Sequence, residues 1–150
     1  MQDSAQSKPN KETIYSKNFL VLCISSFLFF GSFNMLVPEL PAYLEKIGGG
    51  EYKGLIISLF TLTAGLSRPF SGKLADQMGR IPVMLFGAIV TAICGVLYGF
   101  VNSIFLFFLL RLFHGFSTGF TPTGSSAFVA DIVPSSKRGE ALGMFSLAGS

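Results

Sequence analysis

A short charged segment between two long apolar ones decides the fold of this chain: GKLADQMGR, residues 72–80. Gly72 and Asp76 lie four residues apart and therefore share one face of a helix. A glycine on that face would let another helix approach closely. Gly79 is expected to end the helix, because glycine readily adopts the positive φ angle found just after helix ends. We therefore predict a short turn in which Asp76 and Arg80 form a fixed pair of opposite charges.

The composition indicates a membrane protein. Of the 150 residues 50% are hydrophobic and 13% charged, and the mean hydropathy of +0.59 is too high for an ordinary soluble domain. The net charge of +3 comes from dispersed basic residues, which argues against nucleic acid as a partner. Cys23 and Cys94 lie in apolar runs without ligand-forming neighbours. We expect neither a metal site nor a cofactor.

The first half of the chain predicts a polar tail and two membrane helices. Residues 1–17 read as a disordered cytoplasmic tail, and the uncharged run that follows is long enough to cross a bilayer, which needs about 20 apolar residues. We place the first helix at about 18–41. The glycine-rich stretch 42–53 reads as a loop. The second helix is expected at about 54–75, with Arg68 near its far end.

The second half predicts two more complete helices and part of another. Residues 81–110 carry no charge, and the polar pair at 102–103 divides them into helices at about 82–101 and 104–130. After the charged connector 131–139, a helix begins at Glu140 and has 11 residues, about 16 Å, against a membrane core of about 30 Å. We therefore expect an all-α membrane protein with four complete transmembrane helices and the start of a fifth, a fragment of a larger domain at 18–150.

The positions of lysine and arginine predict the orientation. Cytoplasmic loops carry the excess of these residues. Eight lie on the side of the amino-terminal tail (Lys8, Lys11, Lys17, Arg68, Lys73, Arg80, Lys137 and Arg138) and two on the other (Lys46 and Lys53). The amino terminus is therefore expected in the cytoplasm.

The 72–80 segment resembles the loop between the second and third helices of the major facilitator superfamily, whose pattern is roughly G-x-L-A-D-[RK]-x-G-[RK]-[RK]. The matching residues are Gly72, Leu74, Ala75, Asp76, Gly79 and Arg80, and the sequence departs at Gln77 and Ile81. The resemblance implies a cytoplasmic charge cluster in which Arg80 pairs with Asp76 and with Asp131 and holds the outward-facing state. Arg138 and Gly139 also look like the superfamily's connector between the fourth and fifth helices.

Arg111 is the one charge deep within a predicted membrane helix, where burial of a cation costs at least ~2.5 kcal/mol. Such a cost indicates function, although Arg111 could also be a structural residue paired with a backbone carbonyl or a neighbouring helix. Gly115 and Gly119 continue the same stripe of the helix at close-packing spacing. His114, one turn away, is either a packed or hydrogen-bonding histidine or a group that titrates near neutrality.

The run 111–119 resembles the R-x-x-x-G-x-x-x-G motif of proton-coupled facilitators, in which the arginine is associated with proton transfer. Residues 38–44 resemble a motif of the drug/proton antiporter branch, which includes the tetracycline exporters, and 67–69 is similar to some sugar-efflux relatives. The aspartate that many exporters carry in the first helix is absent, and Phe29 falls near its place.

The first and fourth predicted helices are both interrupted, the first by Gly31 and Pro38 and the fourth by Gly115, Gly119, Pro122 and Gly124. Broken helices in repeated halves point to a transporter's substrate path. Asn34, Thr118 and Thr121 would then offer neutral polar contacts, although Asn34 could equally serve only to join two helices.

The sequence is thus identified as the amino-terminal part of a major facilitator transporter, expected to exchange a drug, sugar or metabolite for protons in the cytoplasmic membrane. The implied partners are this small molecule, protons, the lipid bilayer and the carboxy-terminal half of the same transporter. Proton-coupled uptake of a sugar or metabolite, or a structural or assembly role in the membrane, remain alternatives. An enzyme would need clustered catalytic groups inside the helices, where only Arg111 and His114 occur, so we do not expect one.

Overall fold

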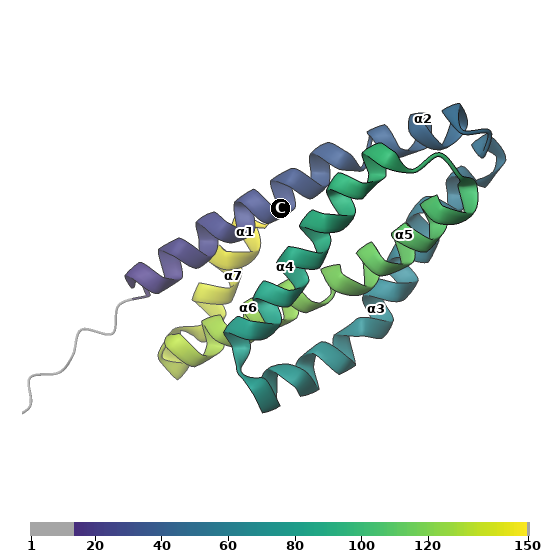
Figure 1. Cartoon of the computed structure of the whole chain (residues 1–150). Coiled ribbons are helices and arrows are strands. Elements are labelled where there is room, and N and C mark those ends of the chain that lie inside the picture. The colour runs from purple at the N-terminus through teal and green to yellow at the C-terminus, as the bar shows by residue number, and fades with distance from the viewer. Residues whose placement is uncertain (1–13, 150) are drawn as a thin grey trace, which may run out of the picture.

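The computed structural model describes residues 14–149, and every regular element within that range is helical (Figure 1). The α-helices are α1 (Lys17–Leu36), α2 (Glu39–Lys46), α3 (Lys53–Met78), α4 (Arg80–Leu97), α5 (Ile104–Thr118), α6 (Phe120–Ile132) and α7 (Arg138–Ala148). Three 3-10 turns, η1 (Gly50–Tyr52), η2 (Tyr98–Phe100) and η3 (Ser135–Lys137), connect them. The predicted all-α class is confirmed.

The expected tail is shorter than the sequence suggested. Residues 1–13 lie outside the described range, but Ile14 is buried against α1, α6 and α7. Ser16 caps α1 by accepting a hydrogen bond from the Phe19 backbone N–H at 3.2 Å, so Lys17 already begins the helix. Assigning the residues from Ile14 to Lys17 to a disordered tail was therefore wrong, because an apolar anchor and an N-cap order them.

The first apolar segment breaks at Pro38 and continues further than predicted. Proline lacks the N–H that a helix needs and its ring clashes with the carbonyl four residues earlier, so α1 ends at Leu36 and α2 begins after the proline. The loop predicted for 42–53 was wrong as far as residue 46. Leu40 and Leu44 share one face of α2 and are fully buried, which keeps this stretch helical.

The turn after α3 forms as predicted. Gly79 has a φ of 95°, ends α3 at Met78 and lets α4 begin at once with Arg80. The predicted division at 102–103 is also present, since η2 ends at Phe100 and α5 begins at Ile104.

The fourth predicted helix is two helices, α5 and α6, which meet at Gly119. Pro122 explains the break, because it cannot donate to the carbonyl of Thr118 and its ring would clash with that carbonyl in a regular helix. By length and composition, three segments of the described chain can cross a membrane: 17–46, 80–100 and 104–132. The 26 residues of α3, about 39 Å, also exceed the membrane core, but Arg68 and several hydroxyl residues lower its hydropathy.

The helices pack around the α5–α6 segment. Helix α3 runs along α5, α4 packs against both α5 and α6, and α1 and α7 lie together beside α6 (Figure 1). One apolar cluster joins α2, α3, α4 and α5 at one end of the bundle, and a second joins α1, α6 and α7 at the other. Large apolar side chains also remain exposed along the outside, such as Ile57 and Phe70 at 64%, as expected for a surface in lipid.

Candidate functional site

Three charged side chains from three helix ends meet beside the turn after α3. Arg80, the first residue of α4, donates through Nε to Asp131 Oδ2 at 2.9 Å and through Nη1 to Asp76 Oδ1. The turn at Gly79 places Asp76 one helical turn before Arg80, and α6 brings Asp131 alongside. The two pairs implied by the family resemblance are therefore present. We call Asp76, Arg80 and Asp131 the loop charge cluster.

The loop charge cluster orients helix ends more than it stabilises them. Asp76 is 69% exposed, Asp131 52% and Arg80 25%, and an exposed ion pair contributes about 1 kcal/mol or less. Arg80 makes its two bonds with different nitrogens of one planar fork, which fixes the direction of approach of both aspartates. The cluster therefore links the ends of α3, α4 and α6 through a contact that is easily broken.

The other glycines and the arginine of the predicted loop motifs take no part in that cluster. A Cβ at Gly72 would meet nothing within 4 Å, so no helix of residues 14–149 makes the close approach expected there. The tight approach occurs instead where α4 crosses α6: a Cβ at Gly87 would stand 2.8 Å from the backbone nitrogen of Thr121. Arg138 opens α7, and Gly139 has open space around it.

Arg111 is 1% exposed and points from α5 toward α3. Its Nε donates to the main-chain carbonyl of Ile56 at 2.9 Å, and its Cζ lies 4.4 Å from the ring centroid of Phe60. These contacts satisfy part of the guanidinium, as the structural alternative required. Its Nη1, however, has no hydrogen-bond partner within the described chain.

Gly115 and Gly119 bring α5 against α3 and thereby create the Arg111 site. A Cβ at Gly115 would stand 2.6 Å from the Phe60 carbonyl oxygen, and one at Gly119 2.8 Å from that of Ala64. The close packing predicted for this stripe is confirmed. Arg111 lies one turn before Gly115 on the same face of α5. The close approach of α5 to α3 at Gly115 therefore also places the guanidinium against the Phe60 ring.

His114 is equally buried, at 1% exposure, and sits in an aromatic cage. Its ring centroid lies 5.7 Å from those of Phe33 and Phe60 and 5.8 Å from that of Tyr98. Neither ring nitrogen of His114 has a hydrogen-bond partner in the described residues. The Tyr98 hydroxyl makes no hydrogen bond of good geometry there either, but it lies within reach of the Arg111 guanidinium. The predicted hydrogen-bonding role of His114 is thus not fulfilled within residues 14–149.

Tyr98, His114 and Arg111 together form what we call the buried polar cluster. An unpaired buried polar group costs about 1–3 kcal/mol, so native proteins rarely leave several side by side without a function. The sequence pattern did not indicate Tyr98 as a candidate site residue. It lies in an apolar run, and only the packing of η2 against α5 brings its ring to Phe107 and His114.

Asn34, Thr118 and Thr121, the neutral polar residues predicted to line a substrate path, lie in different environments. Asn34 is exposed on α1, outside the buried polar cluster. Thr118 donates to the carbonyl of His114 at 2.7 Å, and Thr121 donates to that of Met84 at 3.2 Å. Thr118 thus satisfies a carbonyl within α5 and Thr121 one on α4. Thr121 is half-buried and lines a pocket between α1, α4 and α6, whereas Asn34 is exposed.

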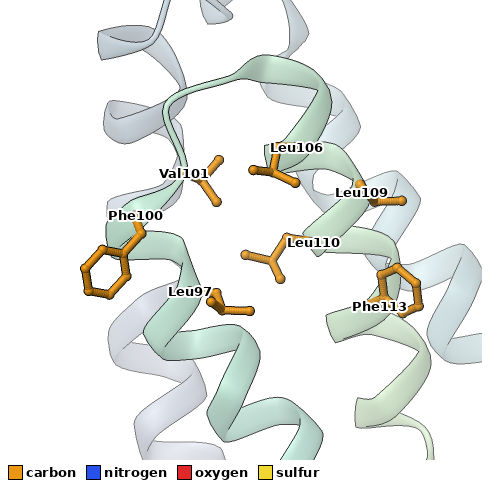
Figure 2. A pocket seen from close by; sticks show the side chains of 7 residues that line it. All are labelled: Leu97, Phe100, Val101, Leu106, Leu109, Leu110 and Phe113. Atoms are coloured by element: carbon orange, nitrogen blue, oxygen red, sulfur yellow. The ribbon is translucent and has the colours of Figure 1, made fainter.

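Pockets occur on two sides of the bundle. Figure 2 shows one of about 250 Å³ between η2 and α5, lined only by apolar side chains such as Leu97, Leu110 and Phe113. It offers no group that could orient a ligand. A second pocket, of about 330 Å³ between α1 and α4, has His114, Thr91 and Ser32 in its wall.

Comparison with known proteins assigns the fold to a family. The model of the Major Facilitator Superfamily matches residues 22–150. The chain belongs to that superfamily. It is therefore a member of a transporter family and not an enzyme, and its helices belong to an integral membrane protein.

Within the superfamily, the chain is similar to curated multidrug resistance proteins. The chain is 36% identical over 141 residues to the multidrug resistance protein MdtG of Rahnella sp. (strain Y9602) and 35% identical to that of Citrobacter koseri. MdtG of Escherichia coli (strain K12 / DH10B) is 33% identical. Each match covers 90% of this chain and 34% of the relative, so the chain spans about a third of their length.

Proposed function

We propose that this chain is part of a secondary active transporter that exports a small molecule in exchange for protons. The observation that carries the proton coupling is the state of Arg111: buried, held by a carbonyl and an aromatic face, with Nη1 unpaired. Arginine does not lose its proton in proteins. It can act only by favouring the ionised form of an acidic group that approaches it, which is how a fixed cation couples a proton to binding.

Export rather than uptake is supported by the names of the relatives, all multidrug resistance proteins. The loop charge cluster itself does not distinguish the two directions, since closing and opening of a cytoplasmic end serves both. We infer that the cluster holds the cytoplasmic ends of α3, α4 and α6 together in the outward-facing state. In this proposal the protein lies in the cytoplasmic membrane with its amino terminus inside, as the distribution of basic residues favours.

Transport by the whole protein in proteoliposomes tests the proposal. A pH gradient is imposed across the membrane and movement of a fluorescent drug is followed with the unchanged protein and with Arg111→Ala. Gradient-driven transport that falls more than tenfold in Arg111→Ala, but not in the exposed control Arg68→Ala, supports the proposal. Transport that does not respond to the gradient would remove proton coupling while leaving the family assignment intact.

A further inference from the structure

The ring of Tyr98 lies across the face of α5 that carries Arg111. Its centroid is 5.6 Å from that of Phe107 and 5.8 Å from that of His114. Phe107 precedes Arg111 by four residues and His114 follows it by three, so their rings lie one turn on either side of the arginine on one helix face. A ring that contacts both of these residues therefore lies beside the turn of α5 that carries the guanidinium.

The polar ends of Tyr98 and Arg111 are complementary, and both are buried. Tyr98 is 4% exposed and Arg111 1%, and neither the tyrosine oxygen nor Nη1 has a hydrogen bond of good geometry in the described residues. A phenol oxygen can accept from an N–H, and a guanidinium can only donate. Because the hydroxyl lies within reach of the guanidinium, a small adjustment of either side chain is enough to make the bond.

Two contacts hold Arg111 and leave Nη1 for a further partner. Nε donates to the carbonyl of Ile56, and the Phe60 ring lies against the guanidinium. Tyr98 is held less firmly, because α4 ends one residue before it and the 3-10 turn η2 begins there. The hydrogen bond from the Val101 backbone N–H to the Tyr98 carbonyl is long, at 3.5 Å. Of the two side chains, the tyrosine is therefore the one with more freedom to adjust.

The surroundings of this pair contain no buried acid. No aspartate or glutamate is buried within residues 14–149. From α3 the pair meets only a backbone carbonyl and the ring of Phe60. The titratable and charged groups that face Tyr98 or line the same pocket come from α5, α4 and α2, and they are Arg111, His114, Cys94, Tyr43, Glu39 and Lys46.

We propose that Tyr98 is a positioning residue for Arg111: its hydroxyl oxygen accepts from Nη1 while the acidic group of the proposed proton coupling is protonated, and releases Nη1 to that group once it ionises. The inference rests on the proposed function and names a second residue that takes part in it. An ionised carboxylate makes the stronger, charge-assisted hydrogen bond and displaces the phenol, whereas a protonated acid does not. The proton passes between the acid and water, and Tyr98 keeps its own.

This exchange of partners gives Tyr98→Phe an effect that depends on pH. The phenyl ring keeps the packing against Phe107 and His114 and removes only the acceptor. At low pH, where the acid is protonated, Nη1 loses its partner and the melting temperature of the whole transporter should fall by about 2 °C or more. At high pH, where the carboxylate pairs with Nη1, the fall should be less than half as large.

Tyr43→Phe is the matched control. The Tyr43 ring also stacks on Phe107, and its hydroxyl donates to the carbonyl of Val101 at 2.7 Å, so its loss should lower the melting temperature equally at every pH. An equal fall at every pH for Tyr98→Phe as well would make Tyr98 a structural residue and overturn the inference. A rise would overturn it too, because it would show that the hydroxyl has no partner in the whole protein.

Three further backgrounds identify the groups responsible for the pH dependence. The pH-dependent effect of Tyr98→Phe should persist in Glu39→Gln and in His114→Gln, since neither side chain is the acid that meets Arg111. It should vanish in Arg111→Met, which has no donor for the tyrosine oxygen. Loss of the effect in either of the first two backgrounds, or its persistence in the third, contradicts the proposed exchange.

Transport separates a failure of this inference from a failure of the proposed function. In proteoliposomes, Tyr98→Phe should shift the curve of transport rate against pH toward lower pH by about one unit, because removing the competitor for Nη1 favours the ionised acid. Tyr43→Phe should leave the curve in place. Gradient-driven transport by the unchanged protein, with an unmoved curve for Tyr98→Phe, overturns this inference alone. Transport by the unchanged protein that ignores the gradient overturns the proposed coupling and this inference together.

Discussion

Arg111 is anchored through Nε to the main-chain carbonyl of Ile56, 2.9 Å away on a different helix. A backbone carbonyl stays in place whichever side chain residue 56 carries, so the guanidinium has a hydrogen-bond acceptor in a fixed position. The Phe60 ring supports its flat face. The guanidinium is thus immobilised, and its Nη1 is buried without a hydrogen-bond partner in the described residues.

Two substitutions of Arg111 distinguish the contribution of its positive charge from that of its planar guanidinium. Arg111→Ala should abolish proton-driven transport by the whole protein, by more than tenfold, without preventing membrane expression. Arg111→Lys should retain a part, because an ammonium keeps the charge but cannot reproduce the planar fork that donates to Ile56 and stacks on Phe60. Transport in vesicles at several pH values measures both. An Arg111→Ala protein with unchanged pH dependence would reduce Arg111 to a packing residue.

Neutralising the loop charge cluster should affect transport far more than stability. Asp76→Asn and Asp131→Asn remove one charge each and keep the side-chain shape. Because both aspartates are more than half exposed, we expect a loss of about 1 kcal/mol or less in unfolding free energy. Transport should nevertheless fall at least tenfold, because each substitution removes an ion pair that stabilises the outward-facing state.

Glu140→Gln is the control for the loop charge cluster, since Glu140 is exposed in the first turn of α7 and makes none of these ion pairs. Membrane insertion of all three variants should match that of the unchanged protein. Normal transport by Asp76→Asn would show that the cluster does not control the cytoplasmic end.

Adding a single methyl group should disturb the crossing of α3 and α5. Gly115→Ala places a Cβ 2.6 Å from the Phe60 carbonyl oxygen, a rigid backbone atom, so the helices must separate. Overpacking of this kind costs about 1–3 kcal/mol. Thermal melting in detergent measures the loss, and Gly54→Ala, where a Cβ meets nothing within 4 Å, should show none.

Single-cysteine labelling can test the orientation. With Cys23 and Cys94 replaced, Asn102→Cys should react with an impermeant maleimide added outside intact cells, and Ser136→Cys should react only after lysis. Both positions are exposed loop or turn residues. Gly49, also expected outside, is a poor probe because a Cβ there would crowd Leu44. The opposite labelling pattern would invert the predicted topology.

What the sequence predicted well were features set by local chemistry. Gly79 ends α3 because a positive φ suits glycine, and Pro122 breaks the fourth segment because it lacks an N–H. The pairs made by Arg80 followed from the family motif. Each of these depends on one residue and its near neighbours in the chain, or on a pattern already known from relatives.

What the sequence could not predict depends on contacts between distant segments. Helix α2 continues past residue 41 because Leu44 is buried against other helices, and Tyr43 adds a hydrogen bond to the carbonyl of Val101 at 2.7 Å, 58 residues away. Gly72 fits a small-residue pattern, yet no helix of the described chain faces it. Tyr98 gave no signal because an isolated tyrosine in an apolar run is common. Which small or polar residue acquires a neighbour is decided only when the helices pack.

The weak packing of the first segment has a consequence for the order of assembly. Only 11% of the most apolar window of residues 17–46 is buried, against 50% for residues 104–132. Helix α1 is synthesised before α6 and α7, the helices that pack beside it, which follow about a hundred residues later. Among the described helices, α1 should therefore remain largely lipid-solvated until α6 and α7 have been synthesised, so that an insertase acting on this protein would have α1 to hold.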